Sequence, residues 1–69
     1  MKKEYIASGY SEEFEMNWFL YKQEDGCYHV VIRDLYKTLY DGVTRCYFNT
    51  GVMYATIYEI MCDLDNKRK

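Results

Sequence analysis

Apolar residues dominate two stretches in the first half of the chain. One stretch covers residues 14–22 (FEMNWFLYK), and the other covers residues 27–32 (CYHVVI). The aromatic residues of the first stretch and the β-branched residues of the second are typical of β-strands. The Asp25-Gly26 pair between them is a strong signal for a tight hairpin turn. The pattern therefore predicts a β-hairpin.

A two-residue type I′ turn at Asp25-Gly26 would determine how these strands pair. It places Tyr21 opposite Val30 and Phe19 opposite Ile32. The face that we expect to form the core would then carry Phe19, Tyr21, Tyr28, Val30 and Ile32. The other face, which is unusually apolar for a surface in water, would carry Trp18, Leu20, Lys22, His29, Val31 and Arg33.

A second Asp-Gly pair, Asp41-Gly42, predicts a second hairpin. Leu35 and Leu39 would face the core there, and both are odd-numbered, whereas the core residues of the preceding strand are even-numbered. Because side chains alternate strictly along a strand, one unbroken strand cannot point both sets inward. We therefore expect a turn or bulge near Asp34. The side of this hairpin that faces away from the core would carry Tyr36, Tyr40, Val43, Arg45 and Tyr47.

Residues 35–41 also fit a short helix, with Asp34 as its N-cap and Gly42 just beyond its end. The tyrosines and the threonine of this segment favour an extended chain, and a single helical turn is a weak signal. The sequence favours the extended form and leaves the short helix open.

The clearest element is a helix near the C-terminus. Asn49 or Thr50 can cap its start, and the pattern continues to about Asp65. Apolar residues recur at spacings of three and four and predict one buried stripe, formed by Met53, Ile57, Ile60, Met61 and Leu64. A second stripe beside it comprises Tyr54, Tyr58 and Cys62.

These elements predict a single α+β domain. Residues 1–12 would be a polar lead-in with a short strand at 4–7, residues 14–48 the hairpins, and residues 50–65 the helix. The fold would be a small antiparallel sheet of three to four strands, a meander of hairpins, with one C-terminal α-helix packed on one face. The second face would be covered either by the lead-in or by another molecule.

The composition agrees with a packed fold and constrains the partner. The 69 residues are 49% hydrophobic and include nine tyrosines, which excludes a disordered chain. A chain of this length buries only about 60% of its unfolded surface, so a partner or a dimer would add stability. The net charge is −2, and several bases lie at the two ends, which leaves an acidic body suited to a basic partner.

Cysteine usage and the absence of long apolar runs bear on the location. Three widely spaced cysteines do not make a disulfide framework, and no stretch has the length of a signal-peptide core or a membrane span. We therefore expect reduced thiols, a cytoplasmic location and no membrane contact.

Two combinations of residues suggest catalysis or metal binding. Cys27 and His29 are two residues apart, as in a thiolate nucleophile with its base, and with Cys46 and Cys62 they have the composition of a zinc site. No third catalytic group, oxyanion site or Cys-x-x-Cys pair supports either interpretation, and the four glycines are too scattered for a phosphate loop. We expect no enzyme activity, no metal and no cofactor.

Tyrosine, tryptophan and arginine dominate protein interfaces, so the surplus aromatic face predicts a protein-binding module, an inhibitor or adaptor of a larger, basic-surfaced protein. A second copy of the chain, in a homodimer, is another candidate partner. The candidate protein-binding residues are Trp18, Leu20, Arg33, Tyr36, Tyr40, Arg45, Tyr47, Glu12, Glu13, Glu15, Asp25 and Asp41. The alternative is a small nucleic-acid-binding regulator that uses an aromatic sheet face, which the scarcity of bases makes less favoured.

A small, acidic, tyrosine-rich α+β protein without catalytic residues resembles in type the inhibitors that phages and mobile elements make against host defence systems, including anti-CRISPR and anti-restriction proteins. The resemblance implies a stoichiometric binder that blocks a basic site on a larger host protein. Tyrosines would anchor it, and the candidate phosphate mimics would be Glu12, Glu13, Glu15, Asp25 and Asp41.

Overall fold

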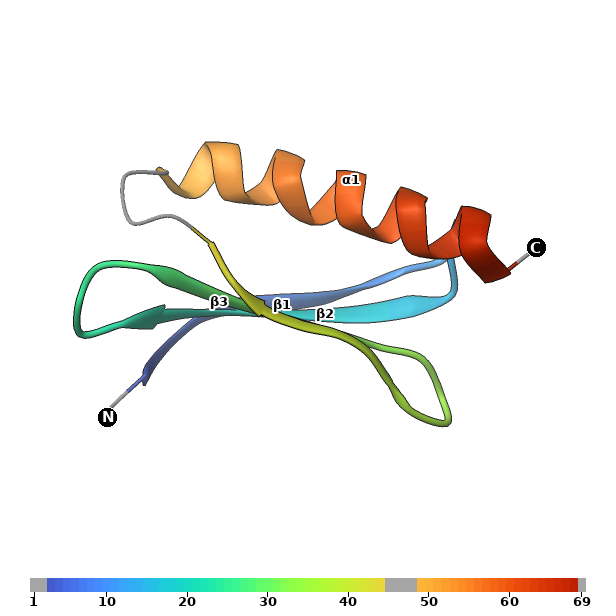
Figure 1. Cartoon of the computed structure of the whole chain (residues 1–69), viewed down its shortest axis with the longest axis horizontal. Helices are drawn as coiled ribbons and strands as arrows, with labels where there is room; N and C mark the ends of the chain where they lie inside the picture. Colours follow the sequence, from blue (N-terminus) through green and yellow to red (C-terminus); the bar gives the residue numbers. More distant parts are fainter. Residues whose placement is uncertain (1–2, 45–48, 69) are drawn as a thin grey trace.

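The computed structural model describes residues 3–44 and 49–68 and shows two layers, a four-stranded antiparallel sheet and one helix (Figure 1). The strands follow one another across the sheet in the order β1-β2-β3-β4, so each neighbouring pair is a hairpin. The elements are β1 (Lys3–Ser11), β2 (Met16–Gln23), β3 (Tyr28–Arg33), β4 (Thr38–Val43) and α1 (Thr50–Arg68). The predicted α+β fold, a hairpin meander with a C-terminal helix, is confirmed.

The helix begins and packs as its sequence predicts. Asn49 caps it, because its side-chain oxygen accepts a hydrogen bond of 2.8 Å from the main-chain N–H of Val52. Met53, Ile57 and Met61 recur at four-residue spacing and are buried against the sheet. The core that they share with the sheet and the β1–β2 turn includes Phe14, Met16, Leu20, Tyr28, Val30 and Ile32.

The β2–β3 turn differs from the predicted two-residue turn by one residue. Gln23 and Cys27 close it, with the N–H of Gln23 donating to the oxygen of Cys27 at 2.8 Å, so three residues form the loop. Gly26 has a φ of +89°, which is the left-handed conformation that a three-residue hairpin loop needs at this position. Leu20 therefore lies opposite Val30, and the predicted pairing of Tyr21 with Val30 is wrong.

This shift of one residue exchanges the two faces of β2, because successive side chains point to opposite sides. Leu20 is fully buried beneath α1, and Trp18 packs against the core with its ring 5.8 Å from that of Tyr54. Phe19 and Tyr21, which were expected in the core, point to the opposite face. The assignment of Trp18 and Leu20 to an exposed face is wrong for this reason.

The predicted break near Asp34 is confirmed, and residues 35–41 form no helix. Asp34 holds the β3–β4 turn with its side-chain oxygen, which accepts hydrogen bonds from the N–H groups of Tyr36 (2.7 Å) and Lys37 (2.9 Å). The turn exposes Leu35, which was expected in the core, and the register shifts between Ile32 and Arg33.

Asp41-Gly42 lies inside β4 and is not a turn. Gly42 is opposite Val30, and a Cβ atom placed on it would lie 2.6 Å from the Tyr40 hydroxyl oxygen. The glycine thus leaves room for the ring of Tyr40 to fold over the strand. Tyr40 packs against the core on the α1 side, which corrects its predicted position facing away from the core. The strand predicted to continue to Phe48 enters residues 45–48, which lie outside the described residues.

Residues 3–11 extend the sheet rather than cover it. They form β1, an edge strand antiparallel to β2, with a bulge between Tyr5 and Ala7. The predicted short strand at 4–7 is therefore part of a longer one. The lead-in leaves the second face of the sheet free.

Candidate protein-binding surface

The sheet face opposite α1, here called the open face, has no described helix or strand packed over it (Figure 1). Strand register assigns side chains to this face, since every second residue of a strand points to the same side. The open face carries Lys3, Tyr5, Ser8, Tyr10, Asn17, Phe19, Tyr21, Gln23, His29, Val31, Arg33, Asp41 and Val43. Six of these thirteen side chains are aromatic or aliphatic, and the other seven are polar.

Tyr21 is the centre of an aromatic cluster on the open face. Its ring lies 6.2 Å from that of Tyr5 in an edge-to-face arrangement and 5.9 Å from the imidazole of His29. The ammonium group of Lys3 lies 5.8 Å above the Tyr21 ring. These contacts hold the rings in place, so the surface is preorganised for binding.

Among the described residues of this face, His29 is the one side chain that is both polar and buried, with 7% of its surface exposed. The Lys3 ammonium donates a hydrogen bond of 2.7 Å to Nδ1, and Nε2–H donates to the Asp41 carboxylate, because an ammonium group can only donate. The hydrogen bond from His29 lowers the pKa of Asp41 below its usual value. Since both ring nitrogens are engaged, the imidazole joins β1, β3 and β4 and leaves no lone pair for proton transfer.

The tip of the β3–β4 hairpin carries two apolar side chains in water. Leu35 is 88% exposed and Tyr36 is 89% exposed. The turn that presents them is held by Asp34, whose pKa is lowered by the main-chain hydrogen bonds from Tyr36 and then Lys37. A well-defined turn therefore displays these two side chains.

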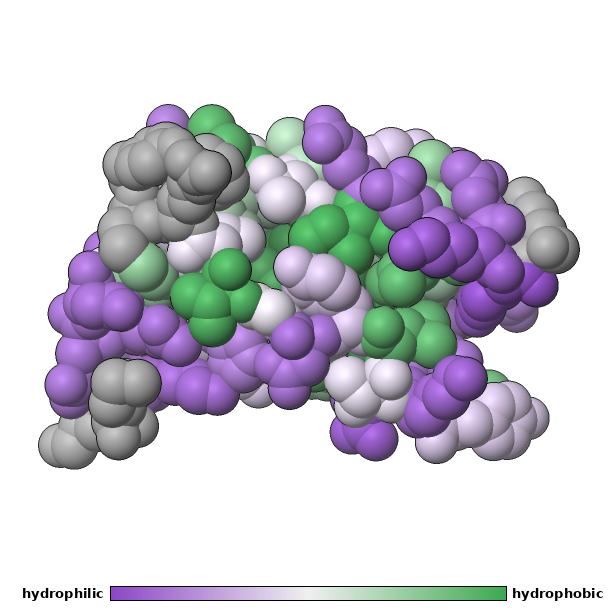
Figure 2. All heavy atoms as spheres, viewed as in Figure 1, coloured by the Kyte–Doolittle hydropathy of each residue, from purple (hydrophilic) through white to green (hydrophobic). Residues whose placement is uncertain are grey.

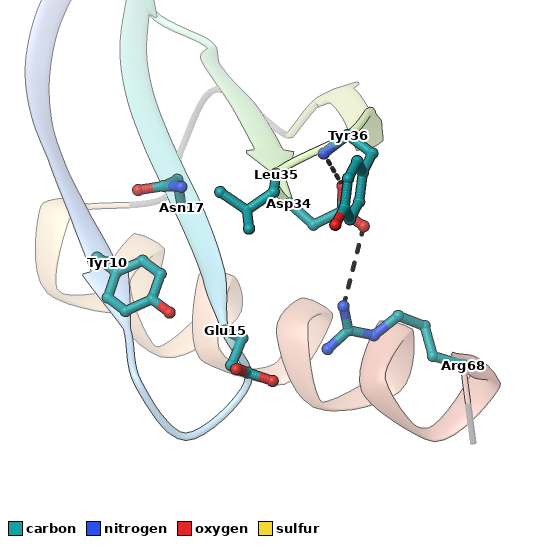
Figure 3. Close-up of a pocket in the computed structure, with 7 residues that line it drawn as sticks. All are labelled: Tyr10, Glu15, Asn17, Asp34, Leu35, Tyr36 and Arg68. Carbon is teal, nitrogen blue, oxygen red and sulfur yellow. Dashed lines mark hydrogen bonds and ion pairs between the residues drawn. The ribbon is translucent and has the colours of Figure 1, made fainter.

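A groove, here called the terminal groove, lies where the open face meets the C-terminal end of α1. Figure 2 shows the surface hollowed between this end of the helix and the protruding β3–β4 hairpin. Its volume is about 290 Å³, and its lining residues, drawn in Figure 3, are Tyr10, Glu15, Asn17, Asp34, Leu35, Tyr36 and Arg68. Tyr10 and Asn17 also belong to the open face, so the groove and the face are continuous.

The predicted site residues do not form one surface. Arg33 lies on the open face and Tyr36 at the hairpin tip, whereas Trp18, Leu20 and Tyr40 lie on the helix side. Arg45 and Tyr47 lie outside the described residues. The residues that the sequence missed are Phe19, Tyr21 and Leu35, which were assigned to the core. A three-residue loop at Glu24–Gly26 predicts the observed register and places Phe19 and Tyr21 on the open face.

The five candidate phosphate mimics are also separated. Glu12, Glu13 and Glu15 lie in the β1–β2 turn at one end of the sheet, and Asp25 lies in the β2–β3 turn at the other. Asp41 is engaged by His29. Glu13 faces α1, where the Tyr58 hydroxyl donates to it at 3.5 Å and the nearby negative charge raises the pKa of Tyr58.

The cysteines differ from the expectation of reduced thiols. Cys27 is disulfide-bonded, and Cys62 on α1 is a free thiol. Within residues 3–44 and 49–68, no three histidine, cysteine or acidic side chains are grouped in a way that could hold a metal ion. Across the same residues, no helix is long and apolar enough to cross a membrane.

Comparison with known proteins found no matching protein family, no similar curated protein and no similar solved structure. The functional argument therefore rests on the geometry of the open face, the hairpin tip and the terminal groove.

Proposed function

We propose that this protein acts by binding another protein through its open face and the tip of the β3–β4 hairpin, as an inhibitor or adaptor and without catalysing a reaction. The observation that carries the proposal is the exposure of Leu35 and Tyr36, both close to 90%. Burying two adjacent side chains with large apolar surfaces in a partner would remove that surface from water and would contribute favourable binding free energy.

The open face adds to this surface. Tyr5, Tyr10, Phe19 and Tyr21 are aromatic side chains of the kind enriched at interface centres. Their rings have only two side-chain torsions each, so burying them costs little conformational entropy. A sheet face of this type supports binding without a deep pocket.

The charge distribution favours a basic partner. The net charge is −2, and the acidic residues of the β1–β2 turn lie at the same end of the sheet as the β3–β4 hairpin. A basic surface that meets the hairpin tip would also meet these carboxylates, which raises the association rate. One specific form of this proposal is an inhibitor of a host defence protein, as the resemblance in type suggests.

A second candidate function is binding of single-stranded nucleic acid. Phe19 and Tyr21 are neighbours on the same face of a central strand, and the basic residues Arg33 and Lys3 lie beside them. Nucleobases can stack on such an arrangement of aromatic rings. Only a few basic side chains are available to contact phosphate groups, and Lys3 already forms a hydrogen bond with His29. Protein binding is therefore the stronger candidate.

The cytoplasmic location stays a prediction. Its argument from reduced thiols does not hold at Cys27, because disulfides persist mainly in oxidising compartments. A homodimer through the open face is a further form of the proposal, which sedimentation at high protein concentration would detect.

The proposal is tested by capture of the partner from the native host, followed by affinity measurements with the purified partner. Leu35→Ser should weaken binding by about tenfold or more, since a buried apolar anchor contributes about 1.4 kcal/mol or more. The matched control is Val52→Ser, which removes an exposed apolar side chain on α1. Equal affinities for the two variants would contradict the proposal.

The nucleic-acid alternative has its own measurement. A salt titration against single-stranded and duplex DNA would show tight binding that weakens steeply with salt if phosphates were the main contact. The protein-binding proposal expects no such binding.

A further inference from the structure

The terminal groove combines two carboxylates, two aromatic rings and an aliphatic side chain. Figure 3 shows Tyr10 on one side, Leu35 and Tyr36 on the other, and Glu15 and Arg68 where the groove approaches α1. The lining thus combines apolar walls with the amide of Asn17 and the charged groups of Glu15, Asp34 and Arg68. The charges that remain uncompensated in the lining determine whether the groove binds an anion or a cation.

Arg68 is the only base among the described residues of the lining, and its charge is already compensated. Its Nη2 donates to the main-chain oxygen of Phe14 at 2.6 Å and to the Asp65 carboxylate at 3.2 Å. Its Nη1 lies 3.9 Å from the Asp34 carboxylate. An incoming anion would have to compete with these groups, and two acidic residues of the lining would repel it.

Glu15 is the group that stays uncompensated. Its carboxylate forms no hydrogen bond or ion pair with any described residue, although it lines the groove. Asp34 is held by the N–H groups of its own turn and by the distant contact with Arg68. With respect to the described residues, the groove therefore has one carboxylate that is free to receive a cation.

The apolar walls match the stem of a long basic side chain. Lysine and arginine bury their methylene groups along apolar surface and keep the charged end near an acceptor. Leu35 would contact the stem, and the rings of Tyr10 and Tyr36 attract a cation over their faces. A small inorganic cation would leave these walls in water.

The geometry points to a binding site for a lysine or arginine side chain of a protein partner in the terminal groove, with the cation on Glu15 and the stem between Leu35 and the two tyrosines. This inference rests on the proposed function and names the chemistry of the partner at one point. It gives the acidic β1–β2 turn a specific role in place of the general phosphate mimicry.

The test is an NMR titration of the isotope-labelled full chain with Nα-acetyl-lysine amide and Nα-acetyl-arginine amide. Both should shift the signals of Glu15, Leu35 and Tyr36 in a saturable way at concentrations on the order of ten millimolar. Nα-acetyl-norleucine amide, which has the stem without the charge, and Nα-acetyl-glutamate amide should shift them much less. Glu15→Gln should weaken the response to the basic probes by about threefold or more, since it removes the charge but keeps the shape.

The control is Glu24→Gln, which removes an exposed carboxylate from the β2–β3 loop and should leave the response unchanged. The inference is overturned by a stronger response to the glutamate probe, by an equal response to norleucine, or by no saturable shift with either basic probe. With the captured partner, loss of affinity in Leu35→Ser but not in Glu15→Gln would overturn the groove site and leave the proposed function standing. Unchanged affinity in both variants would overturn both.

Discussion

Arg68, at the C-terminal end of α1, donates a hydrogen bond of 2.6 Å to the main-chain oxygen of Phe14 in the β1–β2 turn. The same guanidinium lies 3.9 Å from Asp34 in the β3–β4 turn. One side chain thus contacts both hairpins at this end of the sheet and forms part of the terminal groove. The end of the helix is held to the sheet by a charged hydrogen bond as well as by apolar packing.

Replacing Arg68 should loosen this end of the molecule. Arg68→Ala removes the hydrogen bond to Phe14 and the contact with Asp34, and we expect a loss of about 1 kcal/mol, since the side chain is partly exposed. Urea unfolding monitored by circular dichroism measures the loss. Lys67→Ala, in the same helical turn, is the control and should leave the midpoint almost unchanged. Equal midpoints for the two variants would show that the Arg68 contacts are not stabilising.

Glu15 has a φ of +57°, which is unfavourable for a residue with a Cβ atom. Glu15→Gly should raise the free energy of unfolding by about 1 kcal/mol, because glycine adopts this conformation without steric cost. Glu12→Gly, at an ordinary backbone conformation in the same turn, should lower it instead. Thermal unfolding of both variants checks the prediction, which a lower midpoint for Glu15→Gly would contradict.

Gly42 leaves room for the ring of Tyr40. Gly42→Ala should destabilise the fold by about 1–3 kcal/mol, since the new methyl group would overlap the tyrosine side chain. In a Tyr40→Ser background the same change should cost far less. Urea unfolding of the four proteins of this cycle gives the coupling. Additive effects would mean that the glycine is required for another reason.

Two carboxyl groups make the free energy of unfolding depend on pH in the acidic range. The pKa values of Asp34 and Asp41 are lowered in the folded state from 3.8 by their hydrogen bonds, so each group stabilises the fold above its unfolded pKa. This contribution should be lost as the pH falls below about 4, through the lowered folded values. Unfolding at a series of pH values from 7 down to acid measures it. Asp34→Ala should flatten this dependence, and an unchanged slope in that variant would contradict the assignment.

The sequence predicts the helix and the fold class because both depend on strong local signals. Asn49 caps the helix, and Met53, Ile57 and Met61 repeat at the spacing of one helical face. The break near Asp34 also follows from the sequence, since alternation forbids an unbroken strand there. One premise of this prediction is wrong, because Leu35 is exposed rather than buried.

The faces of β2 could not be predicted in the same way. An Asp-Gly pair fits both a two-residue and a three-residue loop, and one residue of difference exchanges every side chain between core and surface. Asp41-Gly42 carries the same signal, yet its glycine serves packing against Tyr40 within a strand. The sequence predicts only the part of β1 at residues 4–7, because small and polar residues weaken the strand pattern over the rest of Lys3–Ser11.

Hydroxyl-radical footprinting of the complex with the captured partner tests the central claim most directly, because it reports the solvent exposure of individual side chains. Five tyrosines among the described residues are well exposed in the free protein and serve as probes: Tyr5, Tyr10, Tyr36, Tyr54 and Tyr58. Binding through the open face and the hairpin tip predicts that Tyr5, Tyr10 and Tyr36 become protected. Tyr54 and Tyr58 on α1 should react as before, and protection of these two with continued reactivity of Tyr36 would contradict the claim.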